Sequence, residues 1–256
     1  MAITYLSGQR IQGQLQVSPK CATFAGGYAG TMGSLMSGTG DWSVSIWGYA
    51  TGGIINNFGL FSSNGTAELM VYQGGNQRIL ASSGGTAIGS TDDSEDIAQD
   101  TWFHAVYTRE SGAGKLYLQG ELVATGTDTT DMPSGTEWRV GHANSSEVWT
   151  GSQIEFAVWN DRVLSLAEVQ KIYNSGVPKR LADAGLTTAY TENLTGYYPM
   201  DTNFDNAYSA GGGTNGVISG SATVGNSSPA TPIPVTNDKT TVTDVPVGSE
   251  FEQTDD

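Results

Sequence analysis

Four residues of one short segment have the chemistry to bind a sugar. The segment is 138–152, WRVGHANSSEVWTGS, and the residues are His142, Asn144, Glu147 and Trp149. Sugar recognition commonly places an aromatic ring under the apolar face of a pyranose, while amides and carboxylates of adjacent loops bind the hydroxyls. We therefore predict a glycan-binding site at these four residues. The alternative is that Trp149 packs on the rim of the fold and that the polar residues are merely solvated.

Hydrolysis of a glycoside would need a different arrangement. A retaining enzyme places two carboxylates about 5–5.5 Å apart, and a strand does so when they alternate, as in Glu-x-Asp-x-x-Glu. No such string occurs in the chain. Glu155 sits in a candidate strand without an acidic residue two positions away, and the acidic run 92–96 has no apolar flanks. Hydrolase activity is therefore disfavoured, and no catalytic residue is predicted.

Nucleophilic and zinc chemistry are also disfavoured. The chain has two histidines, His104 and His142, and one cysteine, Cys21, none of them in a nucleophile-elbow context or with zinc-ligand spacing. His104 falls inside a strand that is apolar on both faces, which predicts a buried structural histidine. Cys21 is predicted to be a small buried apolar residue.

Calcium is the one metal for which the sequence offers ligands. Four residues with hard oxygen donors cluster in the stretch 91–100: Asp92, Asp93, Glu95 and Asp96. The spacing of an EF-hand is absent, and carboxylates clustered in a loop are far more often solvated than bound to metal. We therefore predict a surface loop and no cofactor, with calcium as the minor alternative.

Composition narrows the classes of protein and partner. The chain has 256 residues, of which 35 are glycine, and a formal net charge of −15. So much glycine favours many tight turns between short strands, because glycine adopts positive φ without steric cost. The negative charge repels phosphate backbones and anionic lipid surfaces. No run approaches the roughly 18 apolar residues of a membrane span, and no signal peptide is recognisable. We predict no nucleic-acid or membrane partner, and assembly in the cytoplasm.

The elements that would position these residues are mostly strands. Residues 41–49 alternate, with Trp42, Val44 and Ile46 on one face and Ser43, Ser45, Trp47 and Tyr49 on the other. Further strands are predicted at 54–61, 68–73, 78–82 and 101–108, with a hairpin about Gln119-Gly120 in 115–126. Residues 22–40 are rich in Gly, Ser and Thr, which predicts a sheet edge and loops.

One short helix is predicted after an apolar strand at 154–159. The residues Ser165-Leu166-Ala167-Glu168 form a capping box, in which the Ser and Glu side chains each accept a hydrogen bond from a free backbone N–H. Gly176 and Pro178 are predicted to end this helix.

These motifs together resemble the laminin-G-like, concanavalin A-like family of lectin and glucanase domains. The features that carry the resemblance are Trp102 with His104, the hairpin from Tyr117 to Gly120, Val140-Gly141, and the strand 154–159 leading into Leu164-Ser165 and Tyr173. The resemblance implies an all-β jelly-roll sandwich of two antiparallel sheets. The segment 194–224, which begins LTGYYPMD, resembles the start of such a domain but follows the helix here. We expect it to close the same sandwich; the alternative is a second, incomplete domain.

The sequence therefore divides into three parts. Residues 1–20 are predicted to be a docking arm, residues 21–226 the sandwich domain, and residues 227–256 an extended acidic tail that holds four of the eight prolines. The opening ITYLSGQRIQG and the stretch DKTTVTDVPVGSEFEQTD resemble terminal segments of virion proteins of marine tailed phages.

That resemblance implies a function by contact. We expect a non-enzymatic virion structural protein, a capsid decoration or fibre-like appendage protein assembled in the host cytoplasm and displayed on the particle surface. Its partners would be other virion proteins or further copies of itself, bound through the terminal arms, with glycans as additional ligands. The alternative is a carbohydrate-binding module of a bacterial surface or secreted protein.

Overall fold

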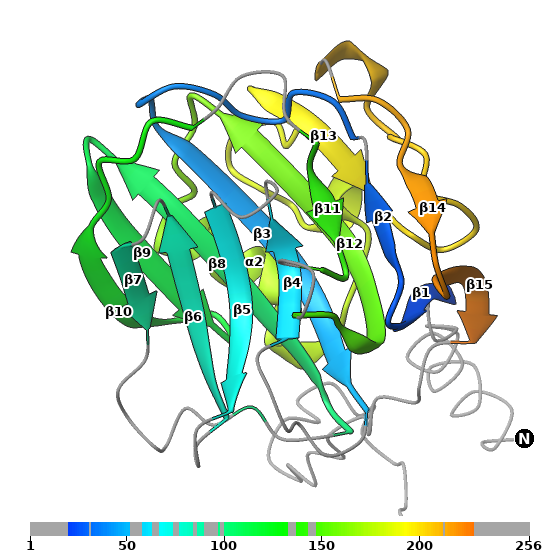
Figure 1. Ribbon diagram of the computed structural model, residues 1–256. Helices are drawn as coiled ribbons and strands as arrows, with labels where there is room; N and C mark the ends of the chain where they lie inside the picture. The colour runs from blue at the N-terminus through cyan, green and yellow to red at the C-terminus, as the bar shows by residue number, and fades with distance from the viewer. Residues whose placement is uncertain are drawn as a thin grey trace, which may run out of the picture.

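The chain folds as a sandwich of two antiparallel β-sheets, which confirms the predicted fold class (Figure 1). The computed structural model describes residues 20–30, 32–51, 58–62, 67–73, 77–83, 86–89, 97, 100–132, 137–142, 147–211 and 213–227. The predicted arm (1–20) and tail (227–256) therefore lie outside these residues except for Lys20 and Ser227, and the acidic run 92–96 lies outside them entirely. Among these residues, no helix is both long enough and apolar enough to cross a bilayer.

The first sheet has eight strands, with β12 (Thr150–Asn160) near its centre. One edge of β12 pairs with β3 (Trp42–Ala50), and the sheet continues through β8 (Trp102–Glu110), β9 (Ala113–Leu118) and β10 (Glu121–Thr127). The other edge of β12 is shared by two strands. Its first residues pair with β1 (Lys20–Ala25), which pairs in turn with β15 (Thr223–Ser227), and its later residues pair with β13 (Leu194–Tyr198).

The second sheet has seven strands, in the order β14-β2-β11-β4-β5-β6-β7. Their bounds are β14 Val217–Ser219, β2 Tyr28–Gly30, β11 Arg139–Val140, β4 Phe58–Ser62, β5 Ala67–Gln73, β6 Gln77–Ser83 and β7 Thr86–Gly89. The strands predicted at 54–61, 68–73 and 78–82 correspond to β4, β5 and β6, although residues 54–57 are outside the description.

The prediction for residues 22–40 was wrong in part. This stretch contains most of β1 and all of β2, and β1 lies within the first sheet between β12 and β15. Small residues give a weak strand signal in the sequence. In the structure, neighbouring strands cover them, so they are buried although their own side chains are short. Ala22 and Ala29, for example, have no exposed surface.

The main core lies between the sheets and follows the predicted alternation of β3. Trp42, Val44 and Ile46 belong to it, together with Phe103, Leu116 and Leu118 from the neighbouring strands. Trp47 and Tyr49 point to the opposite face of the same sheet, where they join Cys21, Trp102 and Ile154 in a smaller apolar cluster. The first sheet is therefore buried on both faces. This explains why β3 is buried along its whole length.

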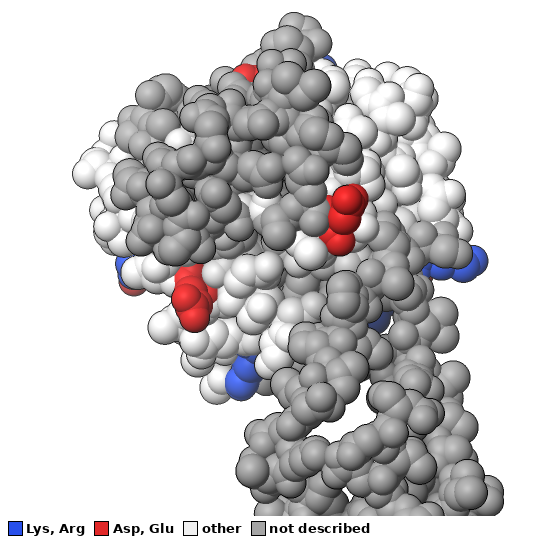
Figure 2. Space-filling view, turned by 90° about the horizontal axis from the view of Figure 1, so that it is seen from below, with Lys and Arg blue, Asp and Glu red and all other residues white. Residues whose placement is uncertain are grey.

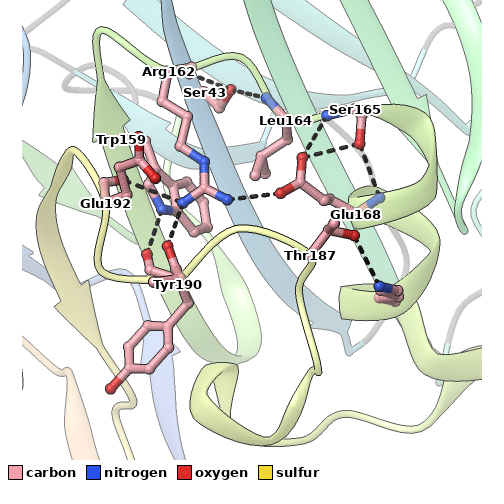
Figure 3. Close-up of polar contacts among 11 residues, drawn as sticks. Ser43, Trp159, Arg162, Leu164, Ser165, Glu168, Thr187, Tyr190 and Glu192 are labelled. Atoms are coloured by element: carbon pink, nitrogen blue, oxygen red, sulfur yellow. Dashed lines mark hydrogen bonds and ion pairs between the residues drawn. The ribbon is translucent and has the colours of Figure 1, made fainter.

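Helix α2 (Leu166–Tyr173) covers part of that outer face. Its capping box is confirmed: the Glu168 backbone N–H donates to Ser165 Oγ at 3.3 Å, and the Ser165 N–H donates to Glu168 Oε2 at 3.0 Å (Figure 3). The predicted end was wrong. The helix stops at Tyr173 because Asn174 takes a left-handed conformation, with φ 48°, which asparagine tolerates more readily than most residues.

The polar network behind α2 fastens the helix to the sheet. Arg162 Nη2 donates to Glu168 Oε1 at 2.7 Å, and Arg162 Nη1 donates to the carbonyl of Ala189 at 2.8 Å (Figure 3). Trp159 Nε1, on β12, donates to the carbonyl of Tyr190 at 2.8 Å. The helix start, the strand before it and the chain after it are therefore joined by one set of hydrogen bonds.

The segment 194–224 closes the same sandwich, as expected. Its three strands pair with β12, β2 and β1, and Tyr198, Met200 and Phe204 contribute to the core between the sheets. Lys20 pairs with Ser227, so the two ends of the described chain leave the sandwich at adjacent positions.

Candidate functional site

The predicted glycan-binding segment is held at its base by backbone hydrogen bonds. The Trp149 N–H donates to the carbonyl of Gly141 at 2.8 Å, and the Gly141 N–H donates to the carbonyl of Leu60 at 3.0 Å. Gly141 has φ +80°, and a Cβ there would lie 2.4 Å from Cδ1 of Phe24. Only glycine fits this position, so β11 must turn sharply here, next to His142.

The four predicted residues divide into three groups. The backbone brings His142 and Glu147 near each other, since His142 forms an antiparallel bridge with Val148, the residue after Glu147. Asn144 lies outside the described residues. The Trp149 side chain has no exposed surface and packs edge-on against Phe103, with ring centroids 5.9 Å apart. This agrees with a packing role for Trp149, as in the alternative, although Trp149 lies in the main core rather than on the rim, and it leaves no ring face on which a sugar could stack.

Three residues that sequence reasoning missed surround His142. The Tyr28 ring on β2 lies 5.1 Å from the His142 ring, and the Arg139 guanidinium on β11 lies over the Tyr28 ring at 4.8 Å from its centroid. Glu137 Oε2 accepts a hydrogen bond from Arg139 Nη2 at 2.9 Å. We call Tyr28, Glu137, Arg139 and His142 the tyrosine site.

The tyrosine site lies on the outer face of the second sheet. Ala29, next to Tyr28 in β2, is fully buried between the sheets, so Tyr28 points the other way. A Cβ on Gly30 would lie 2.7 Å from Glu137 Oε1 and 3.0 Å from Tyr28 Cε2, so both side chains lean over this glycine. Val217, opposite Gly30 in β14, is 60% exposed. An exposed aliphatic side chain therefore borders the site.

The charges of the site are balanced. The hydrogen bond from Arg139 holds the pKa of the Glu137 carboxyl below its usual value, against a smaller opposing effect of burial. Burial lowers the pKa of His142, and Arg139 lowers it further, while Glu137 and Glu147 oppose both effects. At neutral pH the site therefore holds an ionised Arg–Glu pair and a neutral imidazole.

Two polar atoms in the tyrosine site are buried and have no hydrogen-bond partner. They are Nε of Arg139, a donor, and Nδ1 of His142, which donates or accepts according to its tautomer. Buried polar groups are normally satisfied, because an unmade hydrogen bond costs about 1–3 kcal/mol. Both atoms are closed to solvent, so a bound hydroxyl would instead meet the exposed part of the Arg139–Glu137 pair, whose side chains are 16% and 31% exposed.

A sequence signal for part of this site existed. In EWRVG, Trp138 and Val140 are fully buried, so the alternating partners Glu137 and Arg139 point outward. Tyr28 carried no such signal, since only sheet pairing brings β2 beside β11.

The buried carboxylates of the first sheet have structural partners. Glu155 sits at a bulge in β12 with φ 55°, where its N–H donates to the Pro199 carbonyl at 3.3 Å. Its carboxylate accepts hydrogen bonds from Tyr197 and from Arg180 Nη1, the latter at 3.3 Å, and Arg180 also pairs with Asp201. The sequence offered no acidic residue near Glu155, but the fold brings Asp201 to the same arginine.

The predicted structural role of His104 is confirmed. Its side chain is buried, Nε2 is 2.8 Å from Ser45 Oγ, and the ring stacks on Trp47 at 4.9 Å. Burial lowers the pKa of His104 to about 3, so the ring is neutral. In the part of the chain that the structure describes, no three His, Cys, Asp or Glu side chains gather in a way that could hold a metal ion. Figure 2 shows the described charged side chains of one face standing apart rather than forming a patch.

Comparison with solved structures supports the fold. A candidate carbohydrate-binding protein from Bacteroides ovatus matches 83% of this chain with a TM-score of 0.60 and 15% identity; the chain spans 60% of that protein. A heptameric SAP-like pentraxin from Limulus polyphemus matches with a TM-score of 0.56 and 14% identity. The match covers 83% of this chain and 97% of the pentraxin chain. No curated protein sequence matches the chain.

A family model also matches the chain. The model, for laminin-G-like domains of the concanavalin A-like lectin/glucanases superfamily, matches residues 25–170, more than half of the chain. The match includes β2, β11 and the base of the predicted glycan-binding segment. The chain belongs to the concanavalin A-like lectin/glucanases superfamily.

Proposed function

We propose that this chain is a non-enzymatic protein that binds glycans at the tyrosine site. The observation that carries the proposal is the partly exposed Arg139–Glu137 ion pair, with side chains 16% and 31% exposed, next to the Tyr28 ring and the exposed Val217. Hydroxyl groups of a sugar would pair with the Arg139 guanidinium and the Glu137 carboxylate, and the Val217 side chain would contact its apolar face. The Bacteroides ovatus protein, a candidate carbohydrate-binding protein with the same fold, is consistent with this ligand class.

A binding role rather than hydrolysis is supported by how the acidic residues are used. Glu155 and Asp201 share Arg180, Glu168 caps α2, and Glu137 pairs with Arg139. A glycosidase needs two carboxyl groups free to flank one bond. Each of these four carboxylates pairs with an arginine or accepts a hydrogen bond from a backbone N–H.

A glycan array with matched variants tests this proposal. Arg139→Met removes the guanidinium donor, and Glu137→Gln removes the ionised acceptor; we expect each to weaken binding of the sugar selected by the wild type by about tenfold or more. Glu110→Gln, at an exposed site on the first sheet, is the control and should bind like the wild type. Failure of the wild type to bind any glycan, or unchanged binding by both variants, would refute the proposal. Trp149→Ala is a poor probe, because removing a fully buried Trp destabilises the fold.

We further propose that the protein is a virion structural protein, displayed on the capsid or on an appendage of a tailed phage. The support is the resemblance of residues 3–13 and 238–255 to terminal segments of such proteins, and a net charge of −15, which keeps a displayed surface soluble. In this setting, glycan binding would serve adsorption to host or particle glycans. Mass spectrometry of purified particles checks the proposal, and absence of the protein from intact particles would refute it.

The second candidate function is a carbohydrate-binding module of a bacterial surface or secreted protein. The same tyrosine site supports it, because the chemistry of sugar binding does not depend on the carrier. The two settings differ in where the protein accumulates. Recovery from culture medium or the cell envelope in cells free of phage would favour the second candidate.

A further inference from the structure

We propose that β14 is an assembly edge, to which residues 10–17 of a second copy add as a β-strand. β14 is the terminal strand of the second sheet and pairs only with β2 among the described strands (Figure 1). In an antiparallel pair, alternate backbone N–H and C=O groups point away from the partner. Such an edge is a ready template for another strand.

The side chains of β14 leave the core uncovered at this edge. Ile218 lies opposite Ala29, which is fully buried between the sheets, yet Ile218 is 44% exposed. Val217, on the outer face, is 60% exposed. Two of the four large apolar side chains exposed in the described structure are thus adjacent in one three-residue strand.

Two features that usually prevent strand addition are absent from the sequence around this edge. Natural edge strands are commonly protected by charged residues, proline or a covering element. Residues 213–227 contain no charged residue and no proline. The shortness of β14 is the remaining protection.

Residues 10–17, RIQGQLQV, have the pattern of a strand that fits this edge. Ile11, Leu15 and Val17 share one face with Gly13, and glutamines occupy the alternate positions 12, 14 and 16. The apolar face would extend the core beside Ile218, while the glutamines face water. The other terminal segment, 228–256, fits less well because its four prolines lack the N–H needed for continuous pairing.

Charge also favours residues 10–17. Residues 1–20 contain Arg10 and Lys20 and no acidic residue, whereas the sandwich, residues 21–226, has eight Lys and Arg against 20 Asp and Glu. A weakly basic segment is therefore attracted to a strongly acidic sandwich.

The length of β1 favours exchange between copies over docking within one chain. Residues 10–17 are connected to the first residue of β1, Lys20, whereas β14 lies beyond the last residue of β1, Ala25, because Ser219 of β14 pairs with Tyr28. The five steps of β1 span about 17 Å. The three residues from Val17 to Lys20 reach at most about 11 Å. The segment of a second copy has no such restriction, and reciprocal exchange would give a closed dimer.

Sedimentation of the full chain over a range of concentrations tests the proposal. We expect the wild type to dimerise, and Ile218→Lys and Gln14→Pro each to raise the dimer dissociation constant about tenfold or more. The controls are Leu122→Lys, at a 47% exposed apolar residue on the other sheet, and Gln14→Ala, which keeps the backbone N–H. Both should dimerise like the wild type. A wild type that stays monomeric, unchanged dimerisation of both test variants, or equal loss in the controls would overturn the proposal.

Cross-linking distinguishes exchange from docking within one chain. Chains carrying Leu15→Cys are mixed with chains carrying Ile218→Cys and treated with a bismaleimide; Cys21 is fully buried and should not react. We expect cross-linked dimers of the mixed chains. Cross-links that form only within a doubly substituted single chain would overturn the exchange. Dimerisation through β14 does not require sugar binding. The monomeric variants should therefore keep the glycan binding of the wild type.

Discussion

At the scale of single residues, Glu155 combines two unfavourable features. It is buried at a bulge with positive φ, a conformation that costs energy for a residue other than glycine. Burial raises the pKa of Glu155 to about 7, although the hydrogen bond from Tyr197 and the charge of Arg180 oppose this change. The arginine therefore compensates only partly for removing the carboxylate from water.

The raised pKa of Glu155 predicts a pH dependence of stability. A carboxyl whose pKa is higher in the folded state than in the unfolded state stabilises the protein fully below about pH 4.5. That stability is lost as the pH rises through the folded-state value of about 7. We expect Glu155→Gln, which cannot ionise, to be more stable relative to the wild type at pH 8 than at pH 5 by about 2–3 kcal/mol. Urea unfolding at the two pH values measures this, and a difference that is absent or reversed contradicts it.

Gly141 shows how one residue fixes the base of the candidate site. We expect Gly141→Ala to lose about 2–4 kcal/mol of unfolding free energy, from positive φ and from overlap with Phe24. Gly38→Ala is the control, since Gly38 also has positive φ (+75°) but a Cβ there would meet nothing within 4 Å. It should lose only about 1 kcal/mol. Equal losses in urea unfolding would show that contact with Phe24 is unimportant.

At the scale of elements, Glu168 matters more to helix α2 than Ser165, because Glu168 takes part in both the cap and the buried ion pair. Ser165→Ala removes one capping acceptor and should cost about 1 kcal/mol. Glu168→Ala also leaves Arg162, which is 9% exposed, without its carboxylate, and should cost about 3 kcal/mol or more. Chemical unfolding of the two variants gives the comparison. A larger loss for Ser165→Ala would contradict this view of the helix.

The elements also show where local sequence was sufficient. The start of α2 follows from Ser165 and Glu168, and the turn at Gln119-Gly120, with both residues at positive φ, joins β9 to β10 as predicted. These features depend on residues within four positions of each other. The strand β1 was mispredicted because the burial of its small residues depends on neighbours that are distant in sequence. The end of α2 was mispredicted although the contacts of Asn174 are local, to Gln170 and Val177.

At the scale of the whole molecule, the strands after the helix complete the core. Tyr198 and Met200 have no exposed surface, and Phe204 is 2% exposed. We expect a chain truncated after residue 186 to lose its cooperative thermal transition, because the core between the sheets would be open. A chain limited to residues 20–227 should keep the transition, as followed by near-ultraviolet circular dichroism. A cooperative transition in the truncated chain would indicate a smaller independent domain.

The sequence implied the fold class through the resemblance of its motifs to a known family. It also determined the faces of β3, the structural role of His104 and the start of α2, and these three follow from the period of the side chains along one segment or from residues a few positions apart. Tertiary structure alone decided that Trp149 is buried, that Tyr28 and Arg139 lie together beside His142, and that Asp201 shares Arg180 with Glu155. These contacts join strands that are distant in the chain, and the alternation of a strand says which residues share a face but not which strand will lie beside it.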